Sequence, residues 1–478
     1  MINSPQPNYR SVLIQKSVYL FLGRALPVVI LFLITIIYSR KLSYEAYGTF
    51  QSVWMYANII NVVISFGLSA VILSTNLDFL FAFIKKQQQK IVPFYMLISI
   101  AALACFYYFS KNFNAVEKYL VITFIIFQNV ITAAESLMVK QGGEKKSFVI
   151  NFFYSMLFFG WHLYVLSAGY RLVNLIEGAC VVSVLKLVAT VIYTKKNSVA
   201  AVEKDDKKFL GHWAHLGLND ILGVLARWID KIFLLYLLTS ADFAIFFNGS
   251  FEIPLFGLLI SVTGSLLLIE ISSDLQSKHK ITGLYRENFR MLSAIVFPLF
   301  FLLFFFREEI FSIAFKGKYN ASIPIFVISI FVLPIRINNY SVILQCFAQG
   351  KKILVGSIMD LALAILLMIV LYPSMGSRGI ALAIVVATWC QVLYYLWHSK
   401  KLLQVPLSEL IPFKKLLMRF LVLLATYLLL SLLLQNLSAL ISLSLAAIFT
   451  MVVVITGMWH YIKSFFIKDH GKNPEAKY

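Results

Sequence analysis

The chain has 478 residues, of which 60% are hydrophobic and 13% are charged, and its formal net charge is +20. A soluble domain holds about 45–50% apolar and about 25% charged residues, so the composition excludes an ordinary soluble protein. The 15% of aromatic residues excludes a disordered chain.

Fourteen apolar runs, each about as long as a membrane-spanning helix, follow one another along the chain. They cover residues 17–38, 46–73, 91–110, 119–139, 148–168, 172–194, 212–238, 243–270, 291–306, 320–348, 353–372, 377–398, 415–435 and 437–462. The last two are separated mainly by Gln435 and Asn436, which leaves thirteen spans as an alternative. The predicted fold is an all-α polytopic membrane protein with about fourteen transmembrane helices.

A weak internal repeat divides the first twelve runs into two groups of six. The segment Leu42–Phe50 (LSYEAYGTF) opens the second run, and Leu238–Phe246 (LTSADFAIF) opens the eighth. Parallel repeats of this kind are typical of transporters. We therefore predict two parallel six-helix bundles in a pseudo-two-fold arrangement, followed by two further helices. The predicted boundaries are 1–194 and 212–400 for the bundles, 195–211 for a linker loop, 401–467 for the additional helices and 468–478 for a tail.

Lysine and arginine gather in alternate loops, which include Lys85, Lys86, Lys90 and the charged segment Lys195–Lys208. Because cytoplasmic loops are enriched in these residues, both termini are predicted to be cytoplasmic. This dispersed pattern explains the net charge without nucleic acid as a partner. The four cysteines lie singly in apolar runs, and no metal site is predicted.

Three segments resemble motifs of a known family. They are Tyr38–Phe50 (YSRKLSYEAYGTF), Arg227–Leu234 (RWIDKIFL) and Gln349–Lys352 (QGKK). They are similar to polysaccharide-export flippases, including Wzx-type O-antigen flippases, of the MATE-like multidrug/oligosaccharidyl-lipid/polysaccharide exporter superfamily. The span order and length extend this resemblance to the whole chain. It implies a bacterial inner-membrane protein that flips an undecaprenyl-pyrophosphate-linked oligosaccharide by alternating access.

The resemblance also sets expectations about partners. It implies membrane lipids, the lipid-linked oligosaccharide and other polysaccharide-assembly proteins as partners, and no cofactor other than an H⁺ or Na⁺ gradient. A cation-coupled drug antiporter is an alternative, but Arg24 and Arg336 argue against the acidic cavity that cationic drugs need. A lipid II flippase stays open. The external loops are short and hold no catalytic constellation, so a polymerase or glycosyltransferase is disfavoured and no enzyme activity is predicted.

Five cations lie inside predicted spans: Arg24, Lys186, Arg227, Lys231 and Arg336. Such a charge costs at least about 2.5–3.5 kcal/mol on insertion scales, so each needs an explanation. We predict that all except Lys186 face a central cavity and bind an anionic headgroup, since guanidinium groups bind phosphate oxygens in pairs. Lys186 is predicted to snorkel toward the cytoplasmic surface. The alternative is pairing with buried acids, for example Arg227 with Asp230.

Four acids in the spans are candidates for ion coupling: Glu135, Asp230, Glu252 and Asp360. A static salt bridge is the alternative for each of them. Asn58 and Asn61 are candidates for contacts with sugar hydroxyls, and hydrogen bonding between helices is the alternative.

Overall fold

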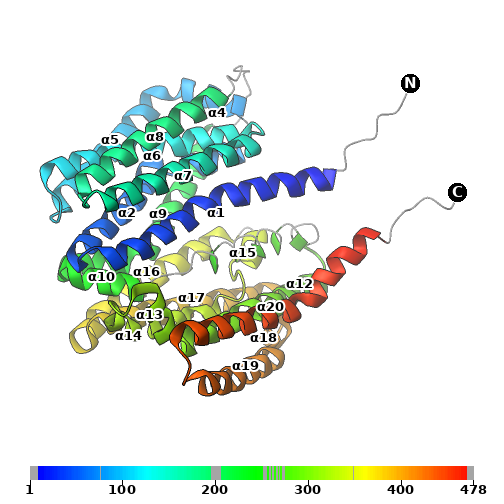
Figure 1. Ribbon diagram of the computed structural model, residues 1–478. Coiled ribbons are helices and arrows are strands. Elements are labelled where there is room, and N and C mark those ends of the chain that lie inside the picture. The colour runs from blue at the N-terminus through cyan, green and yellow to red at the C-terminus, as the bar shows by residue number, and fades with distance from the viewer. Residues whose placement is uncertain are drawn as a thin grey trace. The chain divides into compact units, whose positions relative to one another are not determined.

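The computed structural model describes residues 9–75, 77–194, 206–250, 256–257, 260, 263–264, 267–268, 270–271, 275–347 and 349–470. Within these residues every regular element is a helix. Ten of the helices in this part of the chain are long and apolar enough to cross a membrane. The helices divide into two compact units, Met1–Ala244 and Ile245–Tyr478 (Figure 1).

Within its described residues, the first unit holds nine helices and the start of a tenth. They are α1 (Tyr9–Lys41), α2 (Tyr44–Ser65), α3 (Leu68–Ser74), α4 (Leu77–Lys86), α5 (Gln88–Phe109), α6 (Ala115–Lys140), α7 (Glu144–Ser167), α8 (Leu172–Tyr193), α9 (Asp206–Leu237) and α10 (Ser240–Gly249). Helix α1 packs on α7, α6 packs on α8, and α2 packs on α9. The boundary between the units falls within α10.

The predicted run 46–73 is two helices, because the chain breaks between α2 and α3. Phe66 and Gly67 both adopt left-handed backbone conformations, with φ of 40° and 73°. A Cβ atom at Gly67 would lie 2.7 Å from the backbone nitrogen of Gly217 on α9. The break therefore allows a close approach of two backbones that only glycine permits.

Helix α4 was not among the predicted runs. It has ten residues, too few to cross a bilayer core of about 30 Å. Its residues Phe79, Leu80 and Phe83 are buried, whereas Lys85 and Lys86 at its end are exposed. This amphipathic pattern is typical of a helix that lies along the membrane surface.

The other elements that the structure describes lie in the second unit. They are α12 (Lys278–Phe305), α13 (Arg307–Phe315), η1 (Asn320–Ser322), α14 (Ile323–Ser329), η2 (Ile330–Ile335), α15 (Val342–Cys346), α16 (Gly350–Met375), α17 (Ser377–Leu403), α18 (Leu407–Leu410), α19 (Phe413–Leu434) and α20 (Ala439–His470). Helix α16 packs on α17, and α12 packs on α19 and α20. Helices α19 and α20 are separate, as predicted.

The predicted run 320–348 is broken into short helices in the second unit. Helix α14 passes into the 3₁₀ helix η2, which contains Pro334, and the helical structure stops at Arg336. Proline cannot donate a backbone hydrogen bond and disfavours a continuous helix.

The predicted run 243–270 is described only in part. Contacts place α9 in the first unit, whereas the sequence repeat assigns run 212–238 to the second bundle, and that division stays a prediction.

Candidate functional site

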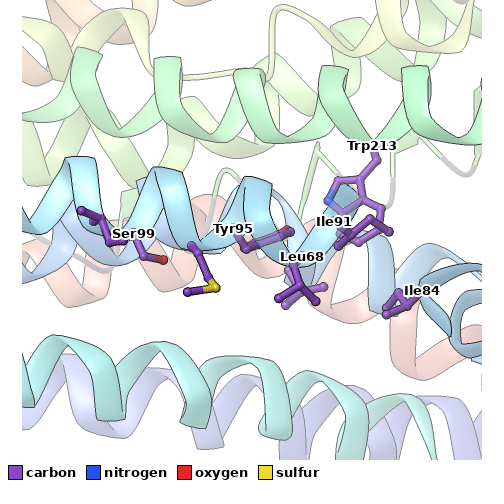
Figure 2. Close-up of a pocket in the computed structure, with 9 residues that line it drawn as sticks. Leu68, Ile84, Ile91, Tyr95, Ser99 and Trp213 are labelled. Carbon is purple, nitrogen blue, oxygen red and sulfur yellow. The ribbon is translucent and has the colours of Figure 1, made fainter. Parts of the chain in front are cut away.

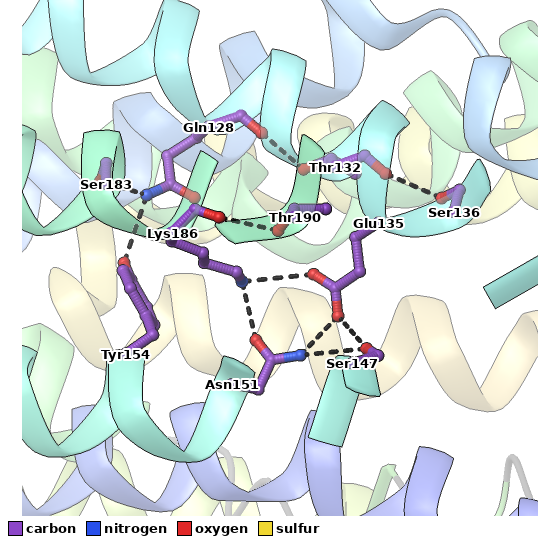
Figure 3. A network of polar contacts seen from close by, with 10 residues as sticks. All are labelled: Gln128, Thr132, Glu135, Ser136, Ser147, Asn151, Tyr154, Ser183, Lys186 and Thr190. Carbon is purple, nitrogen blue, oxygen red and sulfur yellow. Dashed lines mark hydrogen bonds and ion pairs between the residues drawn. The ribbon is translucent and has the colours of Figure 1, made fainter. Parts of the chain in front are cut away.

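A polar network joins α6, α7 and α8 inside the first unit (Figure 3). The Glu135 carboxylate accepts hydrogen bonds from Ser147 Oγ at 2.7 Å and from Asn151 Nδ2 at 2.5 Å. Lys186 Nζ lies 3.2 Å from Glu135 Oε2 and donates to Asn151 Oδ1 at 2.7 Å. The ion pair is thus completed by polar partners on the facing helix α7, which is what a charge in an apolar bundle requires.

The prediction that Lys186 snorkels to the membrane surface is wrong. Its side chain is 9% exposed, and its ammonium group lies 4.7 Å from the centre of the Tyr154 ring. The ammonium group pairs instead with the Glu135 carboxylate on α6. The two groups are close because α6 and α8 pack together. An ion pair and a cation–π contact here replace water as the surroundings of the ammonium group.

The sequence analysis missed the polar partners of the ion pair, and it also missed Gln128, Tyr154 and Ser183. Gln128 Nε2 donates to Ser183 Oγ at 2.9 Å and to the Tyr154 hydroxyl at 3.2 Å. A signal did exist for α7, since Ser147 and Asn151 are four residues apart in an otherwise apolar run. That spacing places both side chains on one helix face.

Helix α9 carries a second ion pair. Lys231 Nζ lies 2.8 Å from Asp230 Oδ2, and both residues are buried. The alternative that Asp230 neutralises Arg227 is therefore wrong, because Asp230 binds its immediate neighbour instead. Arg227 is exposed and donates from Nε to the Gly223 carbonyl at 3.3 Å. Its electrostatic partner is Asp220, two turns away on the same helix.

Arg24 on α1 is also exposed. Among the residues that the structure describes, it forms no hydrogen bond or ion pair. The two cations Arg24 and Arg227 thus differ from Lys186 and Lys231, whose ammonium groups each contact a carboxylate.

The two predicted sugar-binding asparagines on α2 have different surroundings. Asn58 is exposed, and within the described part of the chain its amide donates only to the Trp54 carbonyl of its own helix, at 2.9 Å. Asn61 accepts a hydrogen bond from Asn129 Nδ2 on α6 at 3.1 Å. Asn61 therefore forms a hydrogen bond between helices, which was the alternative to sugar binding. The amide of Asn58 is still exposed.

Helices α2 and α9 bring Asn58 and Arg227 to the same level of the first unit. A Cβ atom at Gly48 on α2 would collide with the Ser240 carbonyl just after α9, and one at Gly67 would collide with Gly217. The pair is therefore antiparallel, with Asn58 and Arg227 both near the middle of the contact. Neither helix is among the ten described helices that are apolar enough to cross a membrane. Their polar residues set them apart from the helices around them.

In the second unit, Arg336 follows η2 and interacts electrostatically with Asp360 of α16. The nearby polar contact between Asn288 Nδ2 and Asn338 Oδ1, at 2.6 Å, was not predicted from the sequence. Glu252 lies outside the described residues. Within the described residues, no cluster of histidine, cysteine or acidic side chains could hold a metal ion.

A known protein family matches more than half of this membrane protein. The sequence profile of a family described as polysaccharide biosynthesis protein matches residues 37–324. The chain belongs to this family. The match includes both ion pairs, Arg227 and the two asparagines of α2, and ends before Arg336. No curated protein matches the sequence of this chain.

The fold of this family member is similar to that of solved transporters. The lipid II flippase MurJ, in an inward closed conformation, is 15% identical, with a TM-score of 0.61 over 94% of this chain and 100% of its own. An inward-facing MATE family multidrug resistance transporter is 12% identical, with a TM-score of 0.55 over 80% of this chain and 98% of its own. The polysaccharide biosynthesis protein is therefore a multi-pass membrane protein with the MurJ and MATE fold.

Proposed function

We propose that this protein flips an undecaprenyl-pyrophosphate-linked oligosaccharide across the bacterial inner membrane by alternating access. The family match and the transporter fold support transport of a lipid-linked intermediate of polysaccharide synthesis. The observation that carries the proposal is the exposure of Arg24 and Arg227, neither of which is in contact with a carboxylate among the described residues. Guanidinium groups of this kind are suited to an anionic headgroup.

The proposed chemistry assigns a role to each polar group. Arg24 and Arg227 each bind two oxygens of the pyrophosphate through two N–H groups. A lysine ammonium group does not offer this two-point geometry. The exposed amide of Asn58, at the level of Arg227, binds a sugar hydroxyl. Lys231 and Arg336, which already interact with acids, bind the headgroup only when they exchange those partners. Because a cation that no carboxylate contacts costs free energy inside a membrane, retaining one is favoured where a ligand anion compensates it.

Ion coupling is part of the same proposal. Among the candidate acids, Glu135 contacts Lys186, Asp230 contacts Lys231, and Asp360 interacts with Arg336. Coupling requires at least one of these carboxylates to exchange its cationic partner for H⁺ or Na⁺ during the cycle. The termini lie in the cytoplasm in this proposal, where other polysaccharide-assembly proteins supply the substrate.

The experiment is reconstitution of the purified chain into vesicles that contain a fluorescent lipid-linked substrate. Two substrates are compared, an undecaprenyl-pyrophosphate oligosaccharide and lipid II, each under an H⁺ gradient and under a Na⁺ gradient. We expect transbilayer movement of the oligosaccharide to exceed that of lipid II. Absence of movement under both gradients, or movement of lipid II alone, overturns the proposal.

Charge-removal variants test the binding residues in the same vesicles. We expect Arg24→Ala and Arg227→Ala to slow transport of the oligosaccharide. The matched control is Arg171→Ala, which removes an exposed guanidinium group at the start of α8. Equal rates for all three variants would contradict the role of Arg24 and Arg227 without contradicting transport itself.

A further inference from the structure

An apolar groove lies within the first unit, between α3, α4, α5 and α9. Its volume is about 430 Å³, within the range of small-molecule sites. Six of its lining residues are labelled in Figure 2: Leu68, Ile84, Ile91, Tyr95, Ser99 and Trp213. Trp213 comes from α9 and approaches Ile91 of α5, while Ile84 lies at one end of the groove and Ser99 at the other (Figure 2).

The two amphipathic aromatic residues of the groove direct their polar atoms to the backbone. Trp213 Nε1 donates to the Phe66 carbonyl at 3.1 Å, and the Tyr95 hydroxyl donates to the Ser65 carbonyl at 3.1 Å. These bonds also hold the two rings in place. The groove therefore presents mainly hydrocarbon and aromatic surface, and this surface suits an acyl chain better than a polar ligand.

Exposed cations stand next in the sequence to two residues that line the groove. Ile84 and Ile91, which line it, are the direct neighbours of Lys85 and Lys90 in the sequence. Both lysines are exposed, and they flank the turn between the surface helix α4 and the membrane helix α5. The carboxylate of α4, Asp78, lies at the other end of that helix. An occupant with its chain in the groove would thus have a headgroup at the Ile84 end close in the chain to these two lysines.

We propose that this groove binds one anionic phospholipid. One acyl chain lies along Trp213, Tyr95 and Ile91, and the phosphate is held by Lys85 and Lys90. Basic residues at the cytoplasmic surface attract anionic lipid headgroups, and amphipathic surface helices strengthen this attraction. Charge complementarity at one end and a hydrocarbon wall along the rest favour a phospholipid over a protein segment, which would leave its backbone polar groups unpaired in the groove.

The test uses quenching of Trp213 fluorescence by lipids with brominated acyl chains. The signal is the difference between the unmodified chain and Trp213→Phe, which isolates one of the seven tryptophans. Brominated phosphatidylglycerol and brominated phosphatidylcholine are compared in otherwise identical vesicles. We expect phosphatidylglycerol to bind more tightly, by roughly fivefold for each lysine that it contacts. Equal quenching by the two lipids overturns the proposal.

Variants separate the headgroup site from the groove. Lys85→Gln/Lys90→Gln, measured with and without Trp213→Phe, should abolish the preference for phosphatidylglycerol. The matched control, Lys414→Gln/Lys415→Gln, removes two exposed lysines at the start of α19 and should leave the preference intact. A preference that survives the first change, or that is lost equally in both, overturns the assignment to Lys85 and Lys90.

Two further measurements test the chain position and the class of lipid. Ser99→Phe places a ring in the groove and should reduce quenching by both brominated lipids, and unchanged quenching would contradict an acyl chain there. Undecaprenyl phosphate added in an amount equal to brominated phosphatidylglycerol should relieve less of the quenching than the same amount of unbrominated phosphatidylglycerol. Full displacement would assign the groove to the polyprenyl carrier and overturn the phospholipid proposal.

Discussion

Two groups of cations within residues 1–244 differ in whether a carboxylate contacts the charged group. The Lys186 side chain is only 9% exposed and contacts Glu135, Asn151 and the Tyr154 ring. Arg24 and Arg227 are exposed and contact no carboxylate among the described residues. All three lie in runs that the sequence predicts to span the membrane. The residue type therefore does not reveal the role of an intramembrane cation, whereas its partner does.

This difference assigns separate physical tasks to the two groups. The Glu135–Lys186 pair bridges α6 and α8 and fixes how these helices pack. The exposed guanidinium groups contribute little to packing and are available to a ligand. If this distinction is correct, mutation of the first group should change stability before transport, and mutation of the second should change transport alone.

The largest effect is expected at the ion pair. Lys186→Met leaves the Glu135 carboxylate without its cation and should destabilise the protein by about 3 kcal/mol, the lower end for a buried pair, because Glu135 keeps 23% side-chain exposure. Glu135→Gln/Lys186→Met removes both charges and should recover most of this loss. Thermal unfolding of the purified protein in detergent measures both variants. A single variant as stable as the unmodified chain would show that the pair does not hold α6 and α8.

The next effect is expected at the exposed cations. Arg24→Gln and Arg227→Gln should each weaken substrate binding by about tenfold, since a hydrogen bond to a charged group contributes about 1.5–3 kcal/mol. Their unfolding midpoints should stay close to that of the unmodified chain, because exposed side chains that contact no carboxylate add little stability. Binding of a labelled lipid-linked oligosaccharide in detergent gives the affinity, with Arg171→Gln as control. A loss of stability equal to that of Lys186→Met would remove the distinction between the groups.

The sequence predicted the helices well because apolar composition is a local property. The run 172–194 corresponds to α8 within one residue, and the run 148–168 lies within α7 apart from its last residue. The break at Phe66 and Gly67 was missed, because it depends on the approach of Gly217, which is far away in the chain. Lys186 was misassigned for a similar reason. Its partner lies on α6, and nothing in the sequence alone shows that α6 and α8 pack together.

A smaller effect is expected at a helix end that belongs to neither group. Asn114 Oδ1 accepts from the Glu117 backbone N–H at 2.9 Å, and Glu117 Oε2 accepts from the Asn114 N–H at 2.9 Å. This capping box begins α6, the helix that carries Glu135. Asn114→Ala should destabilise the protein by about 1 kcal/mol and leave substrate affinity unchanged. If the loss of substrate-binding free energy exceeded the loss of unfolding free energy, the capping box would be linked to transport.

The smallest effects are expected at the two asparagines of α2, which repeat the comparison on one helix. Asn61→Ala removes the hydrogen bond to Asn129 and should cost about 0.6 kcal/mol, the average for such bonds between membrane helices. Asn58→Ala removes an amide that, among the described residues, donates only within its own helix, so stability should not change. Because Asn58 lies at the level of Arg227, its loss should instead weaken binding of the oligosaccharide and not of the free polyprenyl pyrophosphate. Unfolding and binding measurements on both variants distinguish these outcomes. Equal weakening of both ligands by Asn58→Ala would mean that this amide does not bind the sugar.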